Sequence, residues 1–91
     1  MAHCIVSYDL HNQRHYQPVW NALEALGATR VLESLWVVTV SIGAVDLCKR
    51  IKAAADSDDS VVVIELKSGS MWATDKAQPS GLAWLRQNIK A

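Results

Sequence analysis

The order of hydrophobic patterns along the chain limits the fold more than any other feature of the sequence. Residues 4–8 and 61–66 are short, mostly apolar runs of the kind that form buried strands. Residues 16–26 and 44–54 instead repeat apolar side chains every three or four positions, as amphipathic helices do. Between these helices, "TRVLESLWVVTV" contains two β-favouring runs separated by a Glu-Ser pair, which predicts a hairpin.

This order of elements predicts the α+β class. We expect one ferredoxin-like βαββαβ domain over residues 1–91, with a core at 3–66, a C-terminal helical appendix at 67–91 and a four-stranded antiparallel sheet. Right-handed crossovers place the first and third strands side by side in the centre, and we expect those two to be parallel. In the appendix, residues 71–74 predict a short edge strand and Ser80 predicts the cap of a last helix.

Size and charge limit the classes of function. A chain of 91 residues, 51% of them apolar, builds one modest core, so a homodimer is an economical way to bury more apolar surface. The net charge of zero is unlike that of a dedicated nucleic-acid binder. No apolar run approaches the roughly 20 residues of a membrane span, which predicts a cytoplasmic protein with no membrane partner. Cys4 and Cys48 are expected to be buried thiols.

Asp9 ends the first predicted strand, where a side chain projects into the crevice beside the following loop. The fourth strand would start at the same edge, so Asp56, Asp58 and Asp59 of "DSDDS" are within possible reach of it. Hard cations such as Mg²⁺ are held by one or two carboxylates with water and substrate phosphate. Two alternatives stay open, because Asp9 also suits an Asx-turn and "DSDDS" also suits a solvated turn.

The residues around Asp9 have two interpretations each. His11, Arg14 and His15 form a small patch of phosphate-contacting groups, or a polar loop that stays solvated. The two histidines are four positions apart but straddle a loop and a helix start, which argues against zinc. Tyr8 either stacks on a nucleic-acid base or packs in the core with its hydroxyl at the rim.

Two further groups are open in the same way. Lys49, Arg50 and Lys52 either grip phosphates or form a solvated helix face. Trp72 stands in an irregular polar segment, where it either closes the core or docks on a partner subunit.

Several short motifs resemble a known family. "IVSYDL" and "LGATRVLESLWVV", in a chain of about this length, are similar to the small CRISPR-associated adaptation proteins of the Cas-two-like superfamily, which includes VapD-type ribonuclease toxins and SinR-type small proteins. The resemblance covers residues 4–66, and "PSGLAWLRQNIK" resembles the SinR-type proteins. It implies a ferredoxin-like homodimer in which Asp9 faces its twin across the two-fold axis and helps hold a divalent metal. It also implies a nucleic-acid contact at Arg30, because Arg30-Val31 matches the family's Arg-Val pair.

These observations lead to a functional hypothesis. We expect a metal-dependent phosphodiesterase acting on RNA or DNA, in which two Asp9 carboxylates position Mg²⁺ or Mn²⁺ as the catalytic and metal-binding residues. Arg14, His11 or His15 would neutralise the charge that develops on the phosphate, and the general base is left open. The alternative is a non-catalytic dimeric module that keeps only the fold and binds nucleic acid or a protein.

Overall fold

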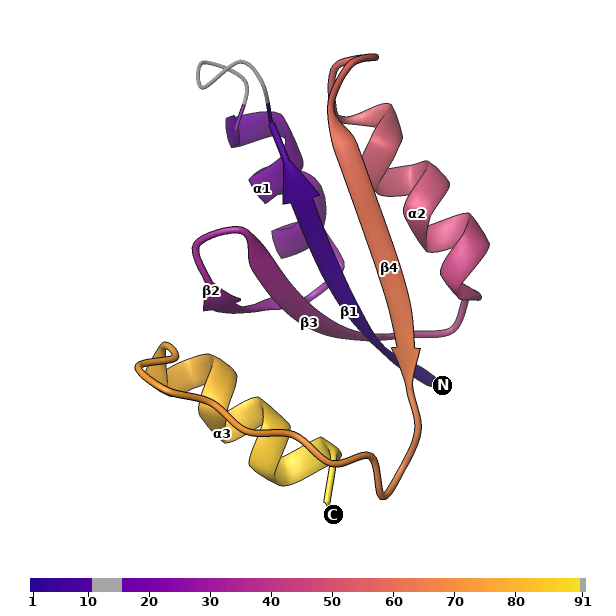
Figure 1. The fold of residues 1–91 in the computed structure, drawn as a ribbon. Helices are drawn as coiled ribbons and strands as arrows, with labels where there is room; N and C mark the ends of the chain where they lie inside the picture. Colours follow the sequence, from indigo (N-terminus) through magenta and orange to yellow (C-terminus); the bar gives the residue numbers. More distant parts are fainter. Residues whose placement is uncertain (11–15, 91) are drawn as a thin grey trace.

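The computed structural model describes residues 1–10 and 16–90, which form one sheet and three helices (Figure 1). The elements follow the order strand, helix, strand, strand, helix, strand, helix that the sequence patterns predict for the core and its appendix. Their bounds are β1 (Ala2–Asp9), α1 (Tyr16–Ala25), β2 (Thr29–Leu32), β3 (Leu35–Val40), α2 (Ala44–Ala53), β4 (Ser60–Leu66) and α3 (Pro79–Asn88).

The four strands lie in the order β2-β3-β1-β4, and each neighbouring pair is antiparallel. The predicted ferredoxin-like sheet is therefore confirmed, including the central position of β1 and β3. The expectation that β1 and β3 run parallel is wrong. The crossover through α1 returns the chain so that β2 runs in the direction of β1, and the hairpin then reverses β3.

The turn at Glu33-Ser34 confirms the predicted hairpin between β2 and β3. Its pairing shifts between Arg30 and Leu32, which marks a bulge or irregularity in β2. An extra residue in one strand adjusts the strand's direction, so a hairpin without Asn-Gly chemistry can still close. Because Ser7 near the end of β1 pairs with Leu35 at the start of β3, the turn lies at the same end of the sheet as the end of β1.

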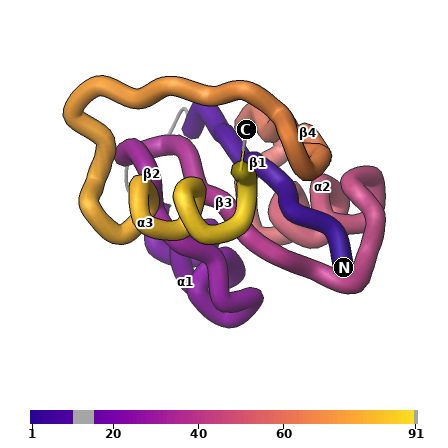
Figure 2. The backbone as a smooth tube through the Cα atoms, turned by 90° about the horizontal axis from the view of Figure 1, so that it is seen from below, coloured from indigo at the N-terminus to yellow at the C-terminus, as the bar shows by residue number. Residues whose placement is uncertain are grey.

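Each face of the sheet has its own hydrophobic core. The first face packs against α1 and α2 through Cys4, Val6, Leu23 and Leu47, all with no exposed surface. The C-terminal segment covers part of the second face, opposite α1, as the view along the sheet shows (Figure 2). That second core is formed by Val31, Val37, Leu85 and Ile89, with Trp72 packed against it.

The appendix departs from the expected details. Residues 71–74 form no strand; the Trp72 indole donates a hydrogen bond to the Ile89 carbonyl oxygen at 2.6 Å, so the segment packs against α3 instead. Ser80 lies inside α3, whose N-cap is Gln78 with Pro79 at the first helical position. Proline suits that position because its missing N–H has no partner inside the helix. Trp72 thus closes the core, as one of its two interpretations expected.

The last helix lies unusually close to β2. Gly81 is buried, and a Cβ atom at this position would lie 2.5 Å from Val31 Cα and 2.6 Å from the Arg30 carbonyl oxygen. Both distances are shorter than a van der Waals contact, so only glycine allows this approach of helix to strand. Gln78 N–H also donates to the Val31 carbonyl oxygen at 2.9 Å. The start of α3 is therefore fixed to β2 by backbone contacts.

Candidate functional site

Asp9 is the last residue of β1, is exposed, and pairs with Ser60 at the start of β4. This confirms its predicted place at the end of a central strand, beside the beginning of the fourth. Two hollows meet at this position and share Tyr8, Asp9 and Ser34. One of about 220 Å³ extends along β4 to Ser60. The other, of about 350 Å³, extends toward α1.

The residues around Asp9 suit a hard cation. Asp9, Ser34, Ser60 and Glu33 line the two hollows, and their side chains carry oxygen donors of the kind that Mg²⁺ and Mn²⁺ prefer. Within residues 1–10 and 16–90, the Asp9 carboxylate takes part in no hydrogen bond. The loop N–H groups that an Asx-turn would need belong to residues 11–15, outside the described part of the chain.

Tyr8 is a core residue, only 5% exposed, and its hydroxyl joins three elements. It accepts hydrogen bonds from the indole N–H of Trp20 at 2.7 Å and of Trp36 at 3.1 Å. It donates one to the Glu33 carbonyl oxygen at 3.1 Å. One hydroxyl thus ties α1 and β3 to the hairpin turn, and we call these contacts the Tyr8 hub. The burial agrees with the core interpretation and leaves no open ring face for a base.

Arg30 is held against the same aromatic residues. Its guanidinium carbon lies 4.4 Å from the centre of the Trp20 ring and 4.7 Å from that of Trp36, which is a double cation–π contact. Arg30 does not line either hollow at Asp9 among the described residues. Its contact with nucleic acid stays a prediction, whereas its packing role is visible. His11, Arg14 and His15 lie outside the described residues.

The acidic segment forms a compact turn of its own. Ligand oxygens of Asp56, Asp58 and Asp59 lie within 4.8 Å of one another, and within the described ranges Asp9 is not part of this cluster. Asp59 is 5% exposed, and its carboxylate accepts the N–H of Asp56 at 2.8 Å. The Asp59 N–H in turn donates to the Asp56 carbonyl oxygen at 3.1 Å. Ser60, which directly follows this segment, pairs with Asp9 in the sheet, whereas the three aspartates form a cluster of their own.

Lys52 organises that turn from α2. Its ammonium donates to the carbonyl oxygens of Asp56 at 2.9 Å and Ser57 at 3.2 Å, and also to that of Asp59. Three carbonyl acceptors occupy the three donors of a lysine ammonium. Lys52 is thus engaged in the turn, while Lys49 is exposed.

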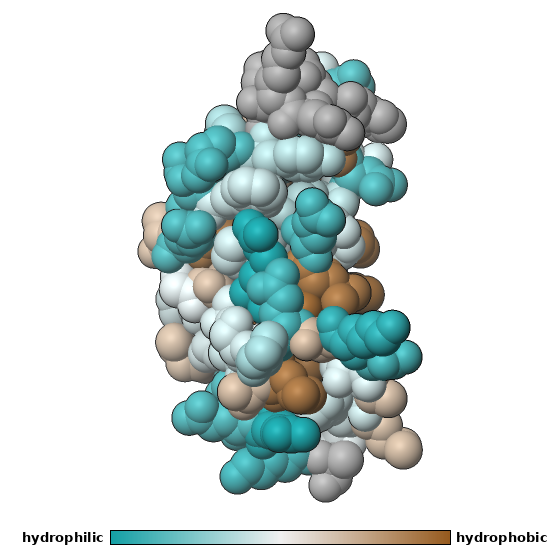
Figure 3. Space-filling model, turned by 90° about the vertical axis from the view of Figure 1, so that its left-hand side faces the viewer, coloured by the Kyte–Doolittle hydropathy of each residue, from teal (hydrophilic) through white to brown (hydrophobic). Residues whose placement is uncertain are grey.

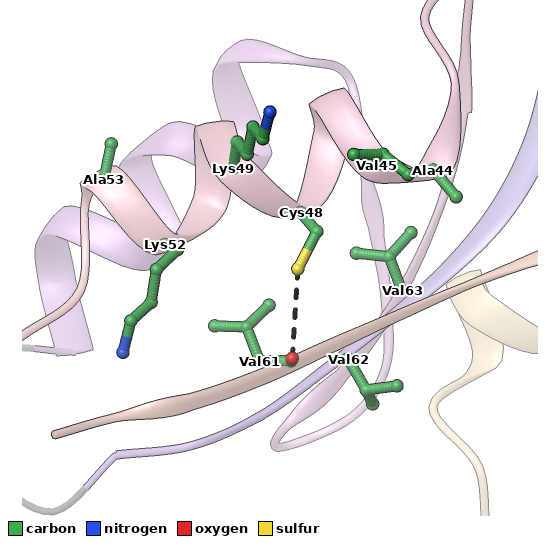
Figure 4. Close-up of a pocket in the computed structure, with 9 residues that line it drawn as sticks. All are labelled: Ala44, Val45, Cys48, Lys49, Lys52, Ala53, Val61, Val62 and Val63. Carbon is green, nitrogen blue, oxygen red and sulfur yellow. Dashed lines mark hydrogen bonds between the residues drawn. The ribbon is translucent and has the colours of Figure 1, made fainter. Parts of the chain in front are cut away.

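A larger hollow lies away from Asp9, between α2 and β4 (Figure 4). Its volume is about 700 Å³, and its walls are mainly apolar, with Cys48 near the Val61 carbonyl oxygen at a sulfur–oxygen distance of 3.9 Å. Figure 4 shows Val62 pointing away from the helix, as the alternation of a strand requires. Because this groove contains no carboxylate, it does not extend the site at Asp9.

Glu33 and Ser34 were predicted as the hairpin turn but not as residues of the site. Both stand in the hairpin turn, and each reaches Asp9 only because β1 lies beside β3 in the sheet. The Tyr8 N–H donates to the Ser34 carbonyl oxygen at 3.2 Å, which fixes the turn to the end of β1. A strand order other than β2-β3-β1-β4 would separate these groups, so the pattern of the turn alone does not reveal them.

The fold and the site define a small α+β protein with a ferredoxin-like sheet and an exposed aspartate at the end of its first strand. The family model of the CRISPR associated protein Cas2 matches residues 1–73. The chain therefore belongs to the Cas2 family, as the motifs around Asp9 and Arg30 indicated. The match ends before α3 begins at Pro79.

Two further findings bear on the class of protein. No solved structure matches the chain. Among the described residues, none of the helices is both long enough and apolar enough to cross a membrane.

Proposed function

We propose that the protein is a metal-dependent phosphodiesterase that acts on RNA or DNA as a Cas2-like homodimer. The observation that carries the proposal is the exposed Asp9 carboxylate, which stands where two hollows meet at the end of a central strand. Membership of the Cas2 family supports the same class of function.

The side chains at Asp9 would have different roles. Asp9 would hold Mg²⁺ or Mn²⁺. The Ser34 and Ser60 hydroxyls would form hydrogen bonds with the water bound to the metal or with the phosphate. When bound, such a cation polarises the phosphate and lowers the pKa of a bound water. His11, Arg14 and His15 stay the predicted groups that neutralise the phosphate charge.

An apolar strip on β4 supports association with a second copy. Val62 is 50% exposed and Ile64 is 52% exposed, and both lie on the sheet face opposite α2. The side of the molecule that carries β2 and α3 shows only separate apolar patches between hydrophilic groups (Figure 3). A second copy covering the strip would remove apolar surface from water at roughly 25 cal/mol per Å². The proposed dimer would bring the two Asp9 side chains to the two-fold axis, as the family resemblance implies.

Cleavage of labelled RNA and DNA, single- and double-stranded, with Mg²⁺, with Mn²⁺ or with EDTA tests the proposal. We expect metal-dependent cleavage by the wild-type protein and a loss of at least a hundredfold in Asp9→Asn. Asp46→Asn is the matched control, since Asp46 is an exposed aspartate in the first turn of α2 and lines neither hollow. Equal cleavage by Asp9→Asn and the control would place the activity elsewhere, and the proposal would fail.

A non-catalytic nucleic-acid-binding module is the second candidate. The specific observation in its favour is that the described residues lining the hollows at Asp9 include no Lys or Arg that could stabilise the charge of a transition state. This function predicts that the protein binds nucleic acid but does not cleave it, whichever metal ion is added. Binding through phosphates would weaken steeply as salt rises, whereas binding to a protein partner would change little.

A further inference from the structure

A hollow on the second face of the sheet lies under the C-terminal segment. Its volume is about 300 Å³, at the lower end of the roughly 300–1,000 Å³ of ligand pockets. The four strands form one wall, α3 forms a second, and the irregular chain between β4 and α3 forms the third. Asp9 and its neighbours Tyr8 and Leu10 are not among the lining residues, so this hollow is separate from the candidate site.

The irregular wall is held at both ends and in the middle. After β4, the Ser70 N–H donates to the Lys67 carbonyl oxygen at 3.0 Å. Further along, the Trp72 indole donates to the Ile89 carbonyl oxygen at 2.6 Å. Just before α3, the Gln78 N–H donates to the backbone of β2 at 2.9 Å. Collapse of this wall into the hollow would cost these bonds, which keeps the space open.

The walls formed by the sheet and by α3 are apolar. Every lining residue that these elements contribute is a valine, leucine or isoleucine, and the polar lining residues Ser70, Thr74 and Asp75 all stand on the irregular wall. A charged molecule would lose its hydration here without finding partners on two of the three sides. An apolar molecule instead leaves water and gains dispersion contacts with the walls.

The mouth and the irregular wall suit an aromatic ligand. Met71 and Leu32 line the hollow and are 90% and 46% exposed, so they stand where it opens to solvent. Methionine is flexible, and its sulfur makes favourable contacts with aromatic rings. Trp72, also a lining residue, has its polar N–H already bonded to Ile89, so the rest of its side chain is apolar.

We propose that this hollow binds one small, neutral, apolar molecule of about the size of two fused aromatic rings. An apolar cavity of about 150 Å³ takes one benzene molecule, so a hollow of about 300 Å³ has room for two fused rings. The bound molecule would contact the sheet, α3 and the irregular wall together, and would therefore stabilise the packing of residues 70–89 on the sheet. This site goes beyond the proposed function and does not depend on Asp9.

Nuclear magnetic resonance with indole as the probe tests the proposal. Indole is neutral, has two fused rings and dissolves to millimolar concentration. In a titration of protein labelled at the methyl groups of Ile, Leu and Val, we expect saturable shifts at Val37, Leu85 and Ile89, with a Kd of about 0.1–1 mM. The methyl groups of Val45 and Val61, which line the hollow between α2 and β4, should stay unchanged.

A substitution that fills the hollow gives an independent check. Ala77 lines it and packs against the second core, so Ala77→Leu should occupy part of the space and weaken indole binding at least fivefold. Ala83→Leu is the matched control, because Ala83 is exposed on α3 and is not a lining residue. Its Kd for indole should stay within about twofold of the wild-type value.

Several outcomes would overturn the proposal. These are the absence of methyl shifts, shifts that do not saturate, shifts at Val45 and Val61 in place of those at Val37 and Ile89, or equal affinities of Ala77→Leu and Ala83→Leu. A dispersed methyl spectrum shows that each variant is folded. If Ala77→Leu does not fold, the map of shifts on the wild-type protein decides by itself.

Discussion

Replacing Tyr8 by Phe removes a single oxygen atom and leaves three polar groups without their partner. The indole N–H groups of Trp20 and Trp36 and the carbonyl oxygen of Glu33 all bond to that hydroxyl, at 2.7, 3.1 and 3.1 Å. A typical intramolecular hydrogen bond contributes about 0.5–1.5 kcal/mol, and a buried donor left unpaired costs about 1–3 kcal/mol. Trp36 is 3% exposed and bears the larger cost, whereas Trp20 is half-buried and regains some water.

We therefore expect Tyr8→Phe to lower the free energy of unfolding by about 2–4 kcal/mol. A protein of this length has a total of roughly 5–14 kcal/mol, so the change is a large fraction of it. Urea unfolding followed by circular dichroism measures the difference. Tyr16→Phe is the matched control, because the Tyr16 hydroxyl is in none of the hydrogen bonds among the described residues. A loss below about 0.5 kcal/mol in Tyr8→Phe, or an equal loss in the control, would refute the role of the Tyr8 hub.

Three further predictions concern other parts of the molecule. Gly81→Ala should lower the midpoint of thermal unfolding. Overpacking against Val31 costs about 1–3 kcal/mol, which exceeds the gain of roughly 1 kcal/mol in helix propensity. An unchanged midpoint in a melting curve would contradict this prediction. Lys52→Met should destabilise the turn after α2 by about 1–3 kcal/mol through its unpaired carbonyl oxygens, measured by urea unfolding, whereas Lys49→Met should change little. Burial, and secondly the carboxylate of Glu65 across the β1–β4 pair, raise the pKa of the Cys4 thiol above its ordinary value of 9.0. In the unfolded chain the thiol loses its proton at a lower pH, so the free energy of unfolding should fall as the pH rises above about 9. Urea unfolding at pH 8 and at pH 10 measures this fall, which should be smaller in Cys4→Ala. An equal fall in the wild-type protein and in Cys4→Ala would contradict the prediction.

Local sequence patterns were sufficient to predict the helices and strands of the core and the order of the strands in the sheet. Residues 61–66 lie within β4, and Gly27 ends the first helical segment with a φ of 76°. The direction of β3 relative to β1 was predicted wrongly, although the hairpin itself was expected and already implies it. Residues 71–74 have an apolar content that suits a strand, but Trp72 bonds to the end of α3 and keeps the segment out of the sheet.

The site was predictable only in part, for a physical reason. Asp9 is recognisable because an acidic residue directly after an apolar strand is a local pattern. The Tyr8 hub depends on contacts between residues 12 to 28 positions apart, which no local pattern records. The acidic residues of "DSDDS" were predicted near Asp9 from the strand directions, but Lys52 and the Asp56–Asp59 bonds turn them into a separate unit.

The Tyr8 hub also has a consequence for motion at the candidate site. A hairpin turn and a strand end would each open readily by themselves, with little protection of their amides from exchange with solvent. Here Tyr8 holds the turn through its N–H and its hydroxyl, and the same hydroxyl accepts hydrogen bonds from Trp20 of α1 and Trp36 of β3. The Tyr8 amide should therefore exchange only when these elements open together, as one cooperative unit. Asp9, beside it, is exposed at the end of a central strand, but we expect its backbone to open as slowly as that of the core.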